Sequence, residues 1–272
     1  MSGPRARLDG ILGGFDRLAV AVSGGVDSMT LAWLAYRRLG GAFTAFHAVS
    51  PAVPGAATAR VRAYAGRAGW RLEVVDAGEM ADPRYLTNPV DRCFFCKTDL
   101  YGAIRRHTDA PLASGANLDD LDDYRPGLRA AALHGVRHPL VEAGIGKAAV
   151  RALAAEEGLR DLAELPAAPC LSSRVETGIA ITPEALALVE AAEALLRAAL
   201  PGADAIRARV RRDRLEVQLD APTLATLDET TRAELQDRVA ALAAGLALPL
   251  PVTLAPYARG SAFVHPATAR VG

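Results

Sequence analysis

A short apolar segment that runs directly into two adjacent glycines is the feature that most constrains this fold. Residues 17–22 (RLAVAV) predict a buried strand, and residues 27–39 carry apolar side chains at helical spacing. The loop 23–28 (SGGVDS) joins the two. Adjacent glycines let a backbone approach a ligand closely, and the N-terminus of a helix attracts anions. The sequence therefore predicts a strand–loop–helix unit that binds phosphate, with contacts from Ser23, Gly24, Gly25, Asp27 and Ser28.

The polar residues of this loop narrow the choice of ligand. Ser23 and Ser28 add hydroxyl donors, and Asp27 could hold Mg²⁺ between phosphates. The loop lacks the Gly-Lys-Ser/Thr ending of a Walker A motif, so the chain is not a P-loop NTPase. The alternative is a plain glycine turn at a strand end, which the combination of two serines with an aspartate makes the weaker interpretation.

The rest of the N-terminal part repeats the alternation of strand and helix. Apolar segments at 42–49, 71–75 and 111–114 predict further strands, and 136–140 is another possible one. Helical patterns lie between and after them, at 58–68, 96–106 and 147–157. Strands that alternate with helices indicate an α/β fold with a mostly parallel sheet covered on both faces.

The pattern changes after Arg174. Thr182, as N-cap, and Pro183 predict the start of a long helix that ends near residue 200. Residues 206–211 and 214–219 predict a hairpin, 222–246 a helical stretch, and 252–254 a last strand. We therefore expect a larger domain at 1–175 and a smaller α+β domain at 176–272, for substrate binding or oligomerisation.

A second polar segment, residues 114–120 (SGANLDD), follows the predicted strand 111–114. Gly115 and Asn117 suit contact with a nucleotide, and Asp119 suits Mg²⁺. The alternative is a solvated turn, because Asp119, Asp120, Asp122 and Asp123 form an acidic run.

The three cysteines, Cys93, Cys96 and Cys170, fall in two motif-like segments, DRCFFCK and PAAPCLSSR. A structural zinc site normally needs four protein ligands, and the candidates His47, His107, His134 and His138 do not have convincing spacing. Three thiolates can hold a [4Fe–4S] cluster and leave one iron open. Three unrelated buried cysteines are the remaining alternative.

Composition bears on location and partners. Lys plus Arg equals Asp plus Glu at 31 each, so no overall field attracts a nucleic acid. Residues 239–258 carry no charge, but three prolines favour a helix end and an edge strand over a membrane span. No apolar signal segment starts the chain, and an odd number of cysteines argues against disulfides. We expect a cytoplasmic protein without a membrane partner.

The loop 23–28 resembles the PP-loop of N-type ATP pyrophosphatases, the adenine nucleotide alpha hydrolase-like fold. This resemblance implies that ATP is cleaved between its α and β phosphates, leaving AMP on a carbonyl or carboxyl oxygen. Residues 114–120 resemble the Gly-Thr-Asn-x-Asp-Asp segment of that class, with Ala116 in place of Thr.

A closer resemblance, to the LarE family, spans nearly the whole chain. It includes the PP-loop, residues 88–100, 114–120, 166–174, Glu190 and Glu193, the strand 207–209 and residues 257–261. The family implies an ATP- and Mg²⁺-dependent sulfurtransferase of nickel-pincer cofactor biosynthesis for lactate racemase. Such enzymes adenylylate the carboxylates of pyridinium-3,5-biscarboxylic acid mononucleotide and replace AMP with sulfur.

The resemblance also implies site residues. Some members sacrifice the sulfur of a cysteine that matches Cys170, and others use three cysteines around a [4Fe–4S] cluster fed by sulfide or another donor. All three are present here, which favours the cluster.

Arg207 and Arg209 resemble the family's phosphate-binding pair, although Arg212-Asp213 stands where the family has His-Gly, and a solvated basic face is the alternative. Arg174 could hold the phosphate of the substrate or of AMP. Glu190 and Glu193 could lie near a metal or the substrate, or be solvated. The resemblance further suggests a homo-oligomer.

Three other functions stay open from the sequence. One is a tRNA thiolation enzyme of the same ATPase class, which tRNA-dependent pyrophosphate release would support. Another is an amidating PP-loop synthetase, which would tolerate loss of all three cysteines. The third is a non-catalytic nucleotide-binding metal module, which would form no AMP or pyrophosphate.

Overall fold

The computed structural model describes residues 3–121, 125–167 and 169–264, which form two compact units. The first unit comprises Met1–Ala81 and Cys93–Ala168, and the second comprises Asp82–Arg92 and Pro169–Gly272. The second unit thus includes a segment from the first half of the chain, Asp82–Arg92, whereas the sequence pattern predicted two continuous domains. The functional boundary at residue 175 stays a prediction.

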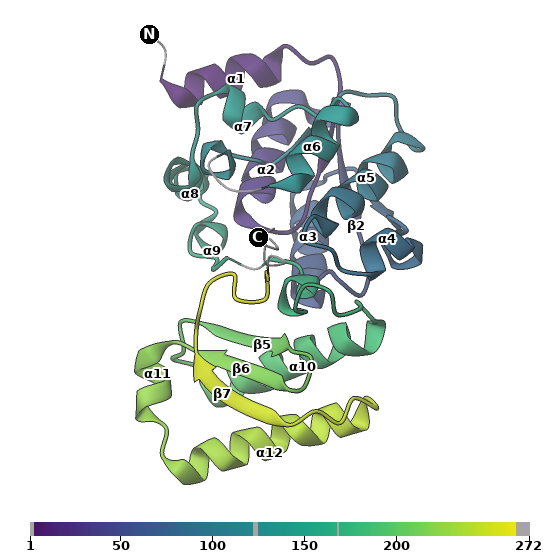
Figure 1. Ribbon diagram of the computed structural model, residues 1–272. Helices are drawn as coiled ribbons and strands as arrows, with labels where there is room; N and C mark the ends of the chain where they lie inside the picture. Colours follow the sequence, from purple (N-terminus) through teal and green to yellow (C-terminus); the bar gives the residue numbers. More distant parts are fainter. Residues whose placement is uncertain (1–2, 122–124, 168, 265–272) are drawn as a thin grey trace, which may run out of the picture. The chain divides into compact units, whose positions relative to one another are not determined.

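A four-stranded parallel sheet forms the centre of the first unit (Figure 1). Its strands are β1 (Leu18–Ala21), β2 (Phe43–Ala48), β3 (Leu72–Val75) and β4 (Leu112–Ser114), in the order β3-β2-β1-β4. In the register of the central strand, Val20 pairs with Ala45 on one side and Ala113 on the other. The parallel α/β architecture predicted from the alternating pattern is confirmed.

Alternate residues of β1 enter two different hydrophobic clusters, because successive side chains of a strand point to opposite faces. Leu18 and Val20 pack in one cluster, and Ala19 packs in the other with residues of α5. The sheet is therefore buried on both faces. The helices of this unit are α1 (Pro4–Gly13), α2 (Val26–Leu39), α3 (Gly55–Ala68), α5 (Arg92–Arg105), α6 (Pro126–Leu133), α7 (Pro139–Glu142), α8 (Lys147–Glu156) and α9 (Arg160–Ala163), with Arg92 itself in the second unit.

The possible strand at 136–140 exists only as a single bridge. Arg137 pairs with Ala113 in parallel orientation, and then α7 begins at Pro139. Proline has no N–H for a sheet ladder but fits the first turn of a helix, so the strand stops there.

The second unit contains a three-stranded sheet of β5 (Ile206–Val210), β6 (Leu215–Leu219) and β7 (Val252–Pro256), in that order. The β5–β6 hairpin is antiparallel, as predicted, and β7 pairs with β6 in parallel. Helix α10 (Pro183–Ala199) packs against β5, and α12 (Glu229–Gly245) packs against β7. Thr182 caps α10 by accepting from the backbone N–H of Ala185, which confirms the predicted start. A short helix, α4 (Pro83–Leu86), comes from the inserted segment.

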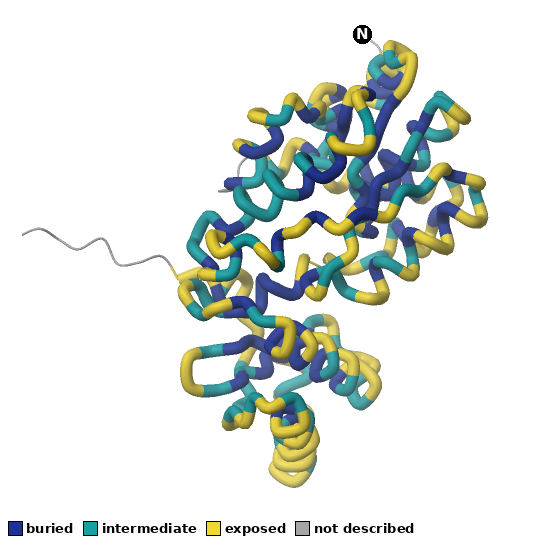
Figure 2. Tube along the Cα trace, turned by 90° about the vertical axis from the view of Figure 1, so that its right-hand side faces the viewer, coloured by how far each residue is buried: buried dark blue, intermediate teal, exposed yellow. Residues whose placement is uncertain are grey.

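The helical stretch expected at 222–246 is two helices, α11 (Ala221–Thr226) and α12. The break occurs because the Asp228 side chain accepts from the backbone N–H of Thr231 and so starts a new helix. Within α12, only Leu235, Val239 and Ala243 are buried, and they lie on one face of the helix. The rest of its surface is largely exposed, as Figure 2 shows.

The uncharged stretch 239–258 ends α12 and forms β7, an edge strand of the sheet, as predicted. No helix within the described part of the chain is both long and apolar enough to span a membrane.

Candidate active site

The loop 23–28 lies between β1 and α2, and its two serines brace it from within. Ser28 Oγ accepts from the backbone N–H of Ser23 (3.1 Å), donates to the Gly25 carbonyl (3.2 Å) and lies 3.1 Å from Ser23 Oγ. Gly24 has a φ of 82°, and a Cβ there would lie 2.8 Å from the Ala57 carbonyl oxygen, so only glycine fits. The serine hydroxyls therefore shape the loop, besides any contact they make with a ligand.

A buried histidine anchors the strand that enters this loop. His47 Nδ1 donates to the Val22 carbonyl (2.8 Å), and Nε2 lies 2.9 Å from Thr58 Oγ1. Burial lowers the pKa of His47, with a smaller contribution from Arg62, which favours the neutral ring. The sequence suggested His47 only as a candidate metal ligand, and its role as an anchor of β1 is visible in the structure. Its position on an apolar strand next to β1 was the available signal.

Residues 114–120 lie directly against the start of α2. A Cβ at Gly115 would be 2.6 Å from both Ser28 N and Ser28 Cα, which explains the glycine. Asn117 Nδ2 donates to Asp27 Oδ1 (3.1 Å). Asn117 also caps the short helix Leu118–Asp120 in a reciprocal capping box with Asp120. The structure thus brings Gly115 and Asn117 together with Asp27 and Ser28, although their predicted contact with a nucleotide stays a prediction.

Asp27 sits in an environment that disfavours its charge. Burial, and next the repulsion from Asp120, raise the pKa of Asp27, while Lys147 and the Asn117 hydrogen bond act in the opposite direction. A divalent cation beside the carboxylate would offset this penalty, so Asp27 fits the predicted Mg²⁺ ligand. Asp119 is less available, because its Oδ2 accepts from the backbone N–H of Lys147 (2.5 Å) at the start of α8. Asp122 and Asp123 lie outside the described residues.

The three cysteines are divided between the units. Cys93 and Cys96 are three residues apart on α5, so they share a face of that helix, and both are partly buried. Cys170 is exposed and directly precedes the short helix Leu171–Arg174 of the second unit. None of the three forms a disulfide. Within the described ranges, no group of three or more His, Cys, Asp or Glu side chains is arranged to hold a metal. Ala168, in the motif of Cys170, lies outside those ranges.

Arg174 is buried and holds the segment that carries Cys170. Its Nε and Nη2 donate to the two carboxylate oxygens of Glu193, at 2.9 and 3.1 Å. Its Nη1 donates to the carbonyls of Pro169 (2.6 Å) and Cys170 (3.1 Å). The backbone of Cys170 is therefore fixed while its thiol is exposed. The predicted contact of Arg174 with a phosphate stays a prediction, and the contacts present are with protein groups.

The remaining predicted residues differ in burial. Glu193 is buried and also accepts from the backbone N–H of Ala208 (3.2 Å), whereas Glu190 is exposed. Arg209 is buried, donates from Nε to Gln218 Oε1 (2.7 Å), and has its pKa lowered to about 10, mainly by burial. Arg207 is partly buried, 5.9 Å from the Tyr257 ring centroid, and burial lowers its pKa too. The alternative of a solvated basic face thus fits neither arginine.

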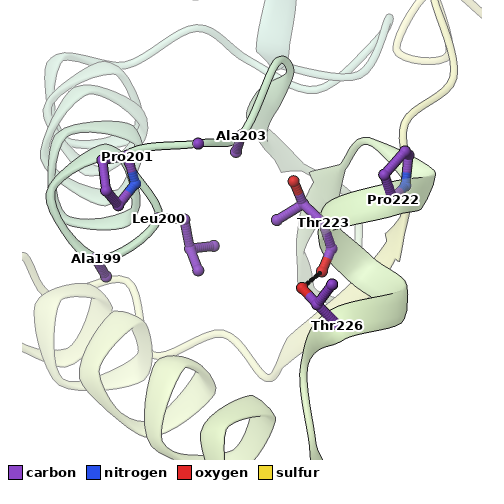
Figure 3. Close-up of a pocket in the computed structure, with 8 residues that line it drawn as sticks. Ala199, Leu200, Pro201, Ala203, Pro222, Thr223 and Thr226 are labelled. Carbon is purple, nitrogen blue, oxygen red and sulfur yellow. Dashed lines mark hydrogen bonds between the residues drawn. The ribbon is translucent and has the colours of Figure 1, made fainter.

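A surface hollow in the second unit includes none of these residues in its lining. It is lined by small and apolar groups at the end of α10 and on α11, including Leu200, Pro201, Pro222 and Thr223 (Figure 3). Thr226 Oγ1 donates to the Thr223 carbonyl (2.8 Å) beside it. Because its lining carries no charged, metal-binding or strongly nucleophilic side chain, it is not the candidate active site.

Comparison with known proteins identifies the family to which the chain belongs. No protein-family model matches the chain. The chain is 40% identical over 216 residues to an uncharacterized protein of Synechocystis, covering 76% of this chain and 78% of that protein. It is 29% identical over 128 residues to an uncharacterized protein of Methanocaldococcus jannaschii, covering 46% and 50%. It is also 30% identical over 220 residues to the pyridinium-3,5-bisthiocarboxylic acid mononucleotide synthase of Lactiplantibacillus plantarum, covering 79% of each chain. On this likeness, the chain belongs to the LarE family.

Proposed function

We propose that the protein is an ATP-dependent sulfurtransferase that converts pyridinium-3,5-biscarboxylic acid mononucleotide to its thiocarboxylate form. The observation that carries the proposal is the 30% identity, over 79% of both chains, to a synthase of that thiocarboxylate product. The braced glycine loop and the adjacent Asp27–Asn117 pair support an ATP site in the first unit.

The first half-reaction is adenylylation. A carboxylate oxygen of the substrate attacks the α-phosphorus of ATP, the bond to the bridging oxygen breaks, and pyrophosphate leaves. The loop amides around Gly24 and Gly25 and the start of α2 favour the anionic phosphates. Asp27 would hold the Mg²⁺ that accompanies them, and Asn117 orients its carboxylate by a hydrogen bond.

The second half-reaction replaces AMP with sulfur. A sulfur nucleophile attacks the acyl carbon, and AMP leaves with the electron pair of the broken C–O bond, which yields the thiocarboxylate. Cys93, Cys96 and Cys170 fit a [4Fe–4S] cluster in number and ligand type. When bound, the cluster would supply an iron without a cysteine ligand, at which inorganic sulfide can bind.

The exposure of Cys170 favours a second sulfur route. Its thiolate could attack the acyl adenylate directly and release AMP, forming a thioester. Loss of the Cα proton and cleavage of the Cβ–S bond would then release the thiocarboxylate and leave dehydroalanine. Arg174 contributes to either route by fixing the backbone of Cys170.

Substitution of Asp27 tests the ATP site. Asp27→Asn is expected to lower substrate-dependent pyrophosphate release by at least about 100-fold, because a neutral amide is a poor Mg²⁺ ligand. The exposed Asp16→Asn is the matched control in the same unit, with activity unchanged. Full activity of Asp27→Asn would remove the proposed role of the loop.

Iron analysis and mass spectrometry separate the two sulfur routes. Protein purified without oxygen is expected to contain about four irons per chain. Cys170 should keep its mass after several turnovers. An iron-free protein that transfers sulfur and loses the mass of H₂S at Cys170 would contradict the cluster and support the second route.

A further inference from the structure

Arg92 is a buried arginine that belongs neither to the proposed ATP site nor to the three cysteines. It lies at the first position of α5, belongs to the second unit, and is only 1% exposed. Its Nη1 donates to Asn88 Oδ1 (2.8 Å). Its Nε and Nη2 are buried and have no hydrogen-bond partner among the residues that the structure describes. The guanidinium is therefore buried with only one of its three nitrogens hydrogen-bonded to a described residue, and that one to a neutral side chain.

Such an arrangement is unusual for a structural arginine. A guanidinium stays protonated under all ordinary conditions, and a buried charge is normally paired or hydrogen-bonded. Buried donors without a partner in a folded protein call for an explanation, of which a missing bound ligand is one. Arg92 thus fits a residue that completes its contacts with a bound anion.

The two open donors are the pair that arginine uses to bind an anion side-on. Nε–H and one N–H of Nη2 point in parallel from one edge of the planar group, and their spacing matches two oxygens of a carboxylate or phosphate. Arg174 provides the template within the same unit, since its Nε and Nη2 bind the two oxygens of Glu193. Arg92 has the same edge, formed by Nε and Nη2, but no carboxylate of the described residues binds it.

The orientation of Arg92 is fixed by its neighbours. Asn88 is fully buried with a φ of 52°, and its Nδ2 donates to the carbonyls of Glu176 (2.9 Å) and Ile179 (3.0 Å). The ring of Phe263 covers the face of the Arg92 guanidinium at 4.7 Å. With its plane held by Asn88 and Phe263, the guanidinium keeps one edge for a ligand, which is the preorganisation that strong anion binding requires.

We infer that Arg92 binds an oxyanion of the mononucleotide substrate, either a carboxylate or the phosphate. This inference rests on the proposed function, in which the substrate brings two carboxylates and one phosphate, while the ATP phosphates are assigned to the first unit. Because both donors are shielded, the anion must displace some of the surrounding packing. Phe263 covers the guanidinium and is 38% exposed, so displacing its ring sacrifices less burial than displacing a fully buried neighbour would.

Calorimetric binding without ATP tests the inference with three probes. They are the biscarboxylate mononucleotide, its nucleoside without phosphate, and the pyridinium mononucleotide without carboxylates. Arg92→Gln is expected to bind the full substrate about 100-fold more weakly than the wild type, and Arg92→Lys, which keeps the charge without the paired donors, about 10-fold. Arg238→Gln, an exposed arginine on α12, is the matched control and should bind as the wild type does.

The truncated probes identify the oxyanion. If Arg92 binds a carboxylate, the difference between wild type and Arg92→Gln persists with the nucleoside and disappears with the carboxylate-free mononucleotide. If it binds the phosphate, the reverse holds. Either result supports the inference.

Three results would overturn the inference, and the first two differ in what they imply for the proposed function. Wild-type affinity in Arg92→Gln for the full substrate would refute the role of Arg92 and leave the function intact. No binding of any probe to the wild type would refute both. A thermal scan excludes misfolding as the cause of weak binding, because loss of an unpaired buried charge should leave the Tm of the ligand-free variant equal or higher. A clear drop in Tm would instead assign Arg92 a structural role and overturn the inference.

Discussion

The predicted anion sites of the two units, the loop in the first and the arginines in the second, are built in opposite ways. The loop uses neutral groups, with glycine backbone amides and two serine hydroxyls that bond to each other and to the loop. The second unit uses full charges, with Arg92, Arg174 and Arg209 buried in the protein. Neutral donors can stay open to solvent at little cost, whereas a buried guanidinium needs a partner for nearly every donor.

This difference locates where each site is vulnerable. The loop depends on glycines that pack closely against neighbouring backbone, so an added side-chain atom should disrupt its structure. The arginines depend on their partners, so loss of a carboxylate should damage them. Arg174 has its partner in Glu193, whereas the open edge of Arg92 is the exception, for which a bound substrate anion is the proposed partner.

Removal of Glu193 has the largest expected effect. Glu193→Ala should lower the free energy of unfolding by about 3–5 kcal/mol, because it leaves the Arg174 charge buried without its partner. Urea unfolding measures the loss. Glu190→Ala, on the exposed face of the same helix, is the control and should cost less than about 1 kcal/mol.

The double variant Arg174→Met/Glu193→Leu separates the charge from the packing. Replacement of both partners by apolar groups of similar size should recover most of the stability lost in Glu193→Ala. The double variant should still transfer sulfur poorly, because the carbonyls of Pro169 and Cys170 lose the donor that fixes them. A double variant as unstable as Glu193→Ala would contradict the comparison.

A methyl group added at Gly115 has the next largest expected effect. Its Cβ would lie 2.6 Å from backbone atoms of Ser28, so the start of α2 or the segment 114–117 must move. Gly115→Ala should weaken ATP binding about 100-fold, equivalent to about 2.7 kcal/mol. Gly41→Ala is the control, because a Cβ there meets no atom within 4 Å and its backbone needs no positive φ. Equal affinity in both variants would show that the loop tolerates added atoms.

The sequence was sufficient for features that depend on neighbouring residues. The strand, loop and helix around residues 23–28, the N-cap of α10 and the β5–β6 hairpin were all predicted, since each needs only a local pattern. The break between α11 and α12 was not predicted, although Asp228 is a residue type that commonly caps the start of a helix. The helical periodicity on both sides concealed it.

Contacts between distant segments could not be predicted. Asn88 reaches carbonyls 88 and 91 residues later in the chain, and no local pattern marks it for that role. The same holds for the burial of Arg92 and Arg174, which depends on how segments 82–92 and 169–174 fold into one unit. An arginine next to a motif suggests a ligand contact in the sequence whether or not protein groups already accept from its N–H donors. Only the structure shows that the donors of Arg174 are occupied and that two nitrogens of Arg92 have no partner among the described residues.

The smallest expected effect concerns the histidine anchor beneath the loop. Burial lowers the pKa of His47, and burial also lowers that of His138, so both favour the neutral ring in the folded protein. In the unfolded chain, with histidine pKa values of about 6.5, these two side chains bind more protons than in the folded protein just below that pH. Their contribution to stability therefore falls as the pH is lowered from 7 to 5.5. Each histidine contributes at most about 1.4 kcal/mol per pH unit to this slope. His47→Gln should reduce this slope in urea unfolding, while the lowered pKa of His138 still contributes to it and the raised pKa of Asp27 acts in the opposite direction. An unchanged slope would mean that the loop is held by groups other than the neutral His47 ring.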